Sequence, residues 1–154
     1  MTNNEVDAFK AEDARYAALV AHAYQRTVPF WEAVRRFWSR WTLRGRASRS
    51  EYWYAQLFLI LAWLVEWSVC LLVAQSGNQR VIVAVNALSW VWDWVTAGLN
   101  ILLSVRRLHD TGRSGWWFFI HLIPIVGVIL EIIWMCQVSE PYENAYGPVP
   151  NCDD

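Results

Sequence analysis

Three long apolar segments constrain the fold of this chain more than any other feature of its sequence. They cover about residues 53–74, 81–103 and 116–138. As an α-helix, the first segment alone would be roughly 33 Å long, enough to cross the hydrocarbon core of a bilayer. A soluble domain of 154 residues rarely encloses three such helices. We therefore predict an all-α fold, a small polytopic membrane bundle of three transmembrane helices.

Local signals mark where the first two segments begin and end. Ser48 followed by Glu51 fits a capping box, in which each side chain bonds the backbone amide of the other residue. A helix is therefore expected to begin at about Arg49. Residues 75–80, QSGNQR, have the composition of a short loop between two helices.

The chain before the first apolar segment divides into two parts. Residues 1–29 are predicted to form an amphipathic helix that lies on the membrane, docks on a partner or covers the protein's own cytoplasmic face. They contain no secretory signal. Residues 30–49 interleave tryptophan and arginine, a mixture typical of an anchor in the headgroup layer. Because this stretch runs directly into an apolar span, we expect it to meet lipid phosphate and not nucleic acid.

Arginine is distributed unevenly between the two expected sides of the membrane. Nine arginines between Arg35 and Arg113 fall on one side of a three-span topology, whereas the other side has Arg80 and an acidic tail, residues 151–154. The positive-inside rule then places the N-terminus in the cytoplasm and the C-terminus outside. Pro124 and Gly127 predict a kink in the third segment, and a re-entrant third segment would return the tail to the cytoplasm.

The segment RRLHDTGRSGWW, residues 106–117, is the most concentrated motif and lies between two apolar segments. One interpretation is a loop that recognises phosphate, with guanidinium donors, with glycines that let backbone amides approach and with His109 and Asp110 as an acid-base pair. The residues expected to bind lipid phosphate on this cytoplasmic face are Arg44, Arg46, Arg49, Arg106, Arg107, His109, Asp110 and Arg113.

The same motif also fits a purely structural turn. Asp110 would then cap the next helix or pair with an arginine, while Trp116 and Trp117 anchor the interface. For catalysis, the motif offers only Ser114 and Thr111 as nucleophiles beside the His-Asp pair, and the sequence has no ligands at metal-binding spacing. We therefore expect no enzymatic activity, no metal and no cofactor.

Several polar residues lie inside the apolar segments. The Asn86, Asp93 and Asn100 side chains are seven residues apart, so they share a helix face that should point at other helices. An unpaired Asp near the bilayer centre costs about 2.5–3.5 kcal/mol on insertion scales. These polar residues fit either a proton or cation path or interhelical hydrogen bonds that fix the register of the helices. The intramembrane polar residues considered are Glu66, Asn86, Asp93, Asn100, His121 and Glu131, with Glu66 and Glu131 expected at one depth.

Four blocks in order resemble a known family. They are GRASRSEYW at 45–53, RRLHDTGRSGWW at 106–117, IPIVG at 123–127 and ENAYGPVP at 143–150. The chain from about residue 37 to 150 is similar to the bacterial inner-membrane family called domain of unknown function 805, the YhaH-like proteins. The resemblance implies a small multispanning inner-membrane protein and carries no established activity.

Together these patterns predict a membrane domain at residues 30–150. We expect a non-enzymatic module whose cytoplasmic arginine-rich face binds anionic lipid headgroups or a protein partner. The alternative is a small proton- or cation-coupled transporter or channel subunit, which would require a homo-oligomer because three spans enclose no wide pore.

Overall fold

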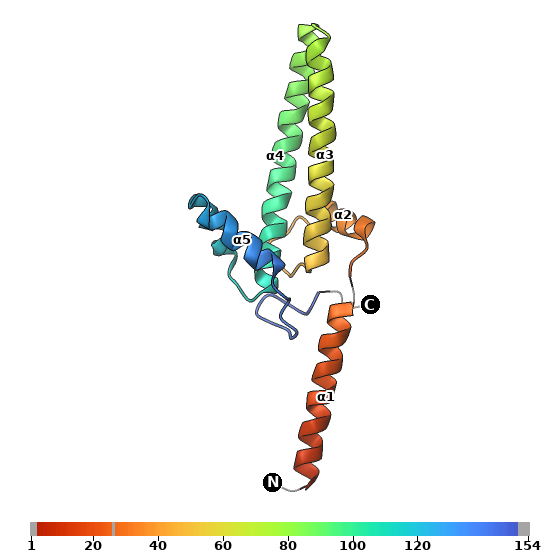
Figure 1. Cartoon of the computed structure of the whole chain (residues 1–154), viewed down its shortest axis with the longest axis vertical. Helices are drawn as coiled ribbons and strands as arrows, with labels where there is room; N and C mark the ends of the chain where they lie inside the picture. The colour runs from red at the N-terminus through yellow and green to blue at the C-terminus, as the bar shows by residue number, and fades with distance from the viewer. Residues whose placement is uncertain (1–2, 26, 151–154) are drawn as a thin grey trace.

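The computed structural model describes residues 3–25 and 27–150, and within these ranges it is all-helical. Two long antiparallel helices form a hairpin, and the shorter elements gather around its lower end in Figure 1. We call this end, where the third helix begins and the fourth ends, the base. The helices are α1 (Asn3–Gln25), α2 (Phe30–Ser39), α3 (Arg49–Gln75), α4 (Gln79–Asp110), the 3-10 helix η1 (Gly115–Leu122) and α5 (Val126–Cys136).

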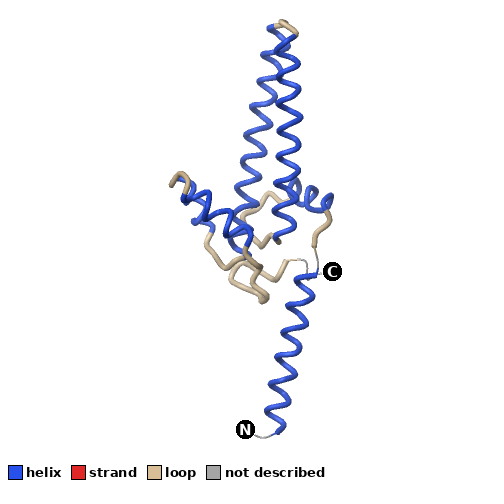
Figure 2. Tube along the Cα trace, in the orientation of Figure 1, coloured by secondary structure: helices blue, strands red, loops and turns tan. Residues whose placement is uncertain are grey.

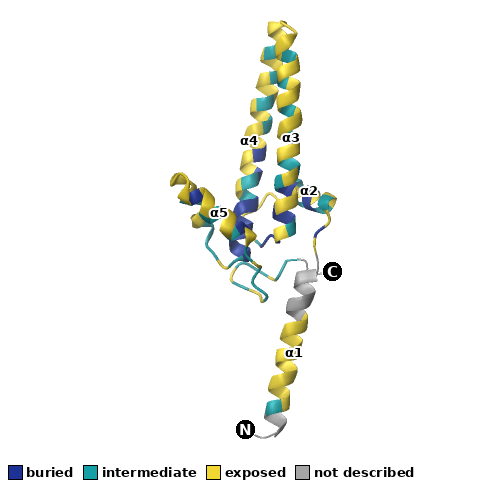
Figure 3. Cartoon of the chain, in the orientation of Figure 1, coloured by how far each residue is buried: buried dark blue, intermediate teal, exposed yellow. Residues whose placement is uncertain are grey.

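The hairpin of α3 and α4 is long and apolar enough for each helix to cross a membrane. At about 1.5 Å per residue the helices measure roughly 40 Å and 48 Å. α3 begins at Arg49 as predicted, and a short turn at 76–78 replaces the expected loop. Large apolar residues are exposed along most of both helices, which are mostly yellow in Figure 3. Such exposure is expected for helices whose solvent is lipid.

The third apolar segment differs from a continuous span. Its first part is η1 and its second is α5, joined by a tight turn in which Ile125 has a φ of 66°. The two parts pack against each other, and Gly127 lies so close to the Ile120 carbonyl oxygen that a side chain would collide with it. Since the 11-residue α5 is only about 16 Å long, the predicted kink is in fact the turn of a helical hairpin.

A small apolar core lies at the base, and its buried side chains come from α2, α3, α4, α5 and the linker between α2 and α3. Contacts link α2 with α3 and α4, and α5 with α3, α4 and η1. This core holds the base together, while the upper hairpin stands free above it, as the traces in Figures 1 and 2 show. Its buried members are Phe37, Ala47, Tyr52, Ala55, Leu99, Leu103, Leu108 and Met135.

The predicted N-terminal helix is present as α1, which extends away from the base in Figure 1. The side chains of residues 7–18 are all exposed, and the described part of α1 packs on no other helix. The expectation that this helix covers the protein's own cytoplasmic face is therefore wrong for these residues. The acidic tail, residues 151–154, lies outside the described residues.

Candidate functional site

The first half of the RRLHDTGRSGWW motif is helical and not a loop. Arg106 to Asp110 form the last turn of α4, and only residues 111–114 make the connection to η1. Arg107 and Asp110 are three residues apart on the helix and form an ion pair. A helical spacing of i, i+3 brings such side chains together, which favours continuation of α4 through the motif.

Asp110 is the centre of this region and is fully buried. Its carboxylate accepts from the Arg46 Nε at 3.0 Å, from the Ser139 hydroxyl at 2.5 Å and from Arg107. Asp110 therefore pairs with arginines and does not cap the next helix. The cap of η1 is instead Ser114, whose Oγ accepts from the Trp116 amide at 3.4 Å.

Arg46 and Arg107 hold the C-terminal tail against the base. Arg46 donates to the carbonyl oxygens of Glu140 at 2.6 Å and Tyr142 at 2.7 Å. Arg107 donates to the carbonyl of Met135 at 3.2 Å and to that of Gln137. The C-terminal segment, residues 137–150, thus lies at the same end of the hairpin as the arginine motif, and the prediction that the chain leaves the third apolar segment on the opposite side is wrong. The third segment folds back, as the alternative to a full span had it.

Glu51 forms the second half of this charged region. Its amide donates to the Ser48 Oγ at 3.3 Å, as the capping box predicts, but its buried carboxylate turns inward to Arg106 at 3.2 Å. Arg36 and Arg40 each lie 3.6 Å from the other carboxylate oxygen. The Glu51 amide is therefore capped by Ser48, while the Glu51 carboxylate is an ion-pair partner and not the second half of a capping box.

We call the five residues Arg46, Glu51, Arg106, Arg107 and Asp110 the buried ionic cluster. It contains three guanidinium groups and two carboxylates, so one positive charge is in excess. Charged groups are stable in a protein interior only when they are paired and hydrogen-bonded. Here main-chain carbonyls accept from the remaining donors of Arg46 and Arg107, whereas the Arg106 Nε has no hydrogen-bond partner among the described residues.

Burial changes the interpretation of the predicted phosphate-binding residues. Arg46, Arg106, Arg107 and Asp110 bond groups of the chain itself and present no donors to an external phosphate. His109 is also buried. Among the predicted residues, Arg44 and Arg49 are exposed, while Arg113 is partly buried, with its guanidinium 5.1 Å from the centre of the Trp134 ring.

His109 and Asp110 do not form the expected acid-base pair. The His109 imidazole stacks on the Tyr146 ring at 3.8 Å between centroids, and its carbonyl accepts from Asn144 at 2.9 Å. The place expected for an external anion is next to Gly112, and the tail's own Glu140 carboxylate lies there. The Thr111 hydroxyl donates to the Leu108 carbonyl at 3.0 Å. No nucleophile of the motif is thus paired with an acid-base group within the described residues.

The intramembrane polar residues fall into separate groups. The His121 imidazole and the Glu131 carboxylate share a hydrogen bond across the hairpin of η1 and α5, beside Leu108 at the base. Asp93 lies about four turns of α4 above Leu108, toward the turn of the long hairpin, and is roughly 22 Å from Leu108. The expectation that Glu66 and Glu131 lie at one depth is also wrong. Glu131 lies in α5, which folds back at the base, whereas Glu66 lies in the upper part of α3.

The predicted polar face of α4 is present, but among the described residues only its Asn100 bonds another helix. The Asn100 Oδ1 accepts from the Gln56 amide at 2.6 Å, which fixes the register of α3 against α4. Asp93 and Asn86 are exposed. The third helix that was expected to cover them is absent from the upper hairpin, because η1 and α5 remain at the base.

The exposed arginines of the base are Arg35 on α2, Arg40 and Arg44 in the linker after it, and Arg49 at the start of α3. The buried face of α2 carries Ala33, Val34 and Phe37, while Trp31 is 75% and Trp41, just beyond the helix, 64% exposed. Arg35 and Arg36 bond Glu32 and lower the pKa of its carboxyl to about 2.

Residues that sequence reasoning missed are Glu51, as an ion-pair partner, and the tail groups from Ser139 to Asn144. The capping-box spacing identified Glu51 but assigned its carboxylate to the helix end. The tail contacts span 94 positions or more from Arg46, and no local pattern in the sequence signals such a contact.

Comparisons with known proteins agree with these features. Residues 40–148 match the family model described as "Protein of unknown function (DUF805)". The chain is 33% identical over 115 residues to the inner membrane protein YhaH of Escherichia coli K12, covering 71% of the chain and 88% of YhaH. It is 29% identical over 106 residues to the inner membrane protein YhaI of the same strain, covering 69% and 83%. No solved structure matches the chain. With its arginine motif, its apolar hairpin and this extent of similarity, the chain is a membrane protein that belongs to the DUF805 family.

Proposed function

We propose that this protein is a non-enzymatic, multi-pass module of the bacterial inner membrane that binds anionic lipid headgroups through the exposed arginines of its base. In this proposal α3 and α4 cross the membrane, and the base with both chain ends lies in the cytoplasm. The positive-inside rule supports this orientation, since the opposite turn of the hairpin carries only Arg80.

The observation that carries the proposal is the composition of α2 and the linker after it. Apolar residues of α2 are buried against α3 and α4, which leaves Arg35, Arg40 and Arg44 exposed beside Trp31 and Trp41. Amphipathic indole rings favour the headgroup layer, and guanidinium groups bond phosphate oxygens in pairs. The buried ionic cluster supports this surface indirectly, because it fixes the linker that bears Arg44.

The contacts favour this function over the transporter alternative. A proton path would require Glu66, Asp93, His121 and Glu131 to follow one another, but the His121–Glu131 pair lies at the base, far from Asp93. Catalysis is disfavoured because Asp110 is engaged with two arginines and His109 with a tyrosine ring.

The test is retention of lipid by the purified full chain in native mass spectrometry, with phosphatidylglycerol against phosphatidylcholine. A basic residue near an anionic surface contributes about 1 kcal/mol. The double variant Arg40→Gln, Arg44→Gln should therefore lose about tenfold in phosphatidylglycerol affinity, given that Arg40 is also close to Glu51. Arg80→Gln, at the other end of the hairpin, is the control and should change nothing. Equal retention in wild type and the double variant would refute the proposal, and a bound protein that survives lipid removal would point to the protein-partner version.

A further inference from the structure

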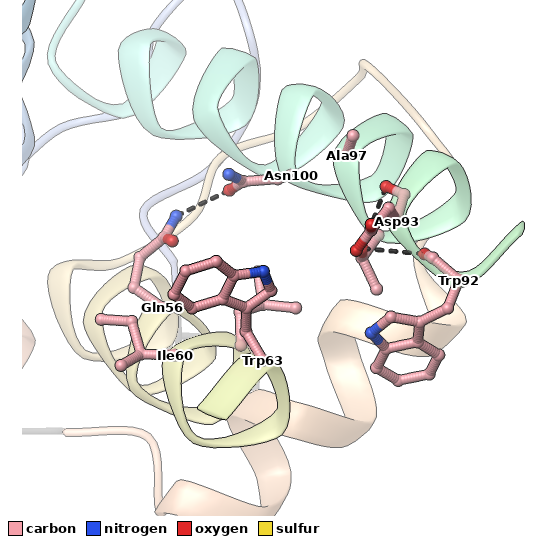
Figure 4. A pocket seen from close by; sticks show the side chains of 9 residues that line it. Gln56, Ile60, Trp63, Trp92, Asp93, Ala97 and Asn100 are labelled. Carbon is pink, nitrogen blue, oxygen red and sulfur yellow. Dashed lines mark hydrogen bonds between the residues drawn. The ribbon is translucent and has the colours of Figure 1, made fainter. Parts of the chain in front are cut away.

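An uncovered groove with a mainly apolar lining runs between α3 and α4 in the upper hairpin, and Asp93 is the charged residue in it. The groove encloses about 270 Å³ and is open on one side. Figure 4 shows Trp63 and Ile60 of α3 facing Asp93 and Ala97 of α4 across it. η1 and α5 contribute no lining residue, because they pack at the base. In a bilayer this groove would face the lipid chains.

The groove leaves a carboxylate without a partner at mid-membrane depth. Asp93 lies near the middle of the apolar part of α4, and no described residue donates a hydrogen bond to its side chain. Asn86, seven residues away on the same helix face, is likewise exposed. Lipid chains offer no hydrogen bonds, so polar groups within a membrane are found facing protein or water. Protein is therefore the expected cover for this face.

The groove also presents a donor at the same depth. Two cross-helix contacts set the register of the hairpin: Gln56 with Asn100, and the Cys70 Sγ with the Ser89 Oγ at 3.5 Å. Trp63 is midway between Gln56 and Cys70 on α3, which places it nearly level with Asp93 on α4. Its indole ring is 53% exposed. An N–H donor and a carboxylate acceptor thus lie side by side on one open face.

A face with a donor and an acceptor at one depth is complementary to itself. Copies of one chain insert into the membrane in the same orientation, so a twofold axis along the membrane normal brings residues of equal depth together. We propose that this groove is the interface between two copies of this chain, with the Trp63 indole of each copy donating to the Asp93 carboxylate of the other. The small Ala97 on the groove floor allows the helices to approach closely.

Disulfide cross-linking in native membranes tests the interface on the full-length chain. In a background with the three cysteines changed to alanine, Ala97→Cys should yield a disulfide-linked dimer on mild oxidation. Val91→Cys is the matched control, because Val91 lies on the opposite face of α4 and is 64% exposed. At least tenfold more dimer for Ala97→Cys supports the proposal. Equal yields would indicate random collisions, and no dimer, or products with other proteins only, would overturn it.

A second variant tests the hydrogen bond and does not depend on cysteine chemistry. Trp63→Phe keeps an aromatic ring and removes the N–H donor. Interhelical hydrogen bonds in membranes are modest, so the dimer dissociation constant, measured by energy transfer between labelled copies on dilution with lipid, should rise about threefold. The same substitution at Trp90, which is not part of the groove lining, should leave the constant unchanged. An equal effect of both substitutions, or no effect of Trp63→Phe, would contradict the proposed contact.

Discussion

Replacing Asp110 with asparagine should release the C-terminal tail from the base. The substitution preserves the shape of the side chain and removes the charge that Arg46 and Arg107 share. Leaving a buried guanidinium without its carboxylate costs about 3–5 kcal/mol. Because both arginines also hold carbonyls of the C-terminal segment, we expect this cost to appear as a shift of about 10²- to 4 × 10³-fold toward the released segment, at about 1.36 kcal/mol per factor of ten.

Proteolysis after Glu143 measures the release, because the bond after Glu140 precedes Pro141 and resists glutamate-specific proteases. The Asn144 side chain donates to the His109 carbonyl at 2.9 Å, which holds the Glu143–Asn144 bond against the end of α4. A glutamate-specific protease can cut this bond only when the segment leaves the base, so the cleavage rate follows the population of the released state. In proteoliposomes the Asp110→Asn protein should be cut at least a hundredfold faster than wild type.

Asp93→Asn is the control for this experiment, because it removes a carboxylate from the same helix without touching the tail. It should be cut at the wild-type rate. The account of the buried ionic cluster fails if Asp110→Asn and wild type are cut after Glu143 at rates within about threefold of each other.

Three further substitutions test other parts of the base. For each, the free energy of unfolding is measured in mixed micelles, with the loss of helix content as the signal. Glu51→Gln leaves Arg106 without its carboxylate and should cost about 3–5 kcal/mol; a loss below 1 kcal/mol would contradict the pairing. Gly127→Ala places a methyl group against the Ile120 carbonyl and should cost about 1–3 kcal/mol. An unchanged free energy of unfolding would contradict the packing of α5 against η1. Ser48→Ala removes the cap of α3 and should cost about 1 kcal/mol, whereas no loss would argue against the cap.

The parts of the fold that follow from local rules were predictable from the sequence. The first residue of α3, Arg49, and the turn after Gln75 are set by capping and turn chemistry within a few residues. The membrane character of the hairpin follows from its length and composition. Each of these signals depends on neighbours in sequence, which is why the prediction and the structure agree.

The burial of the motif depends on long-range contacts and was not predictable in the same way. Periodicity alone does not distinguish an arginine that meets lipid phosphate from one that meets a carbonyl of a distant segment. The Arg107–Asp110 spacing was the one local sign of an internal pair. Similarly, Pro124 and Gly127 indicate a break in the third segment, but the packing of Gly127 on Ile120 decides that the chain folds back.

The arginines of this chain have two different roles, binding of an external phosphate and fixing of the chain's own segments, and burial decides which arginine has which role. Binding of an external phosphate requires exposed donors, and Arg106 and Arg107 have none to offer because both side chains are buried and bond the chain's own carboxylates and carbonyls. A buried, paired arginine instead fixes one arrangement of the segments around it, here the α2–α3 linker, the end of α4 and the tail. It follows that substitutions at Arg106 or Arg107 should impair lipid binding only by loosening the base, whereas those at Arg44 should weaken it in a protein that remains fully folded.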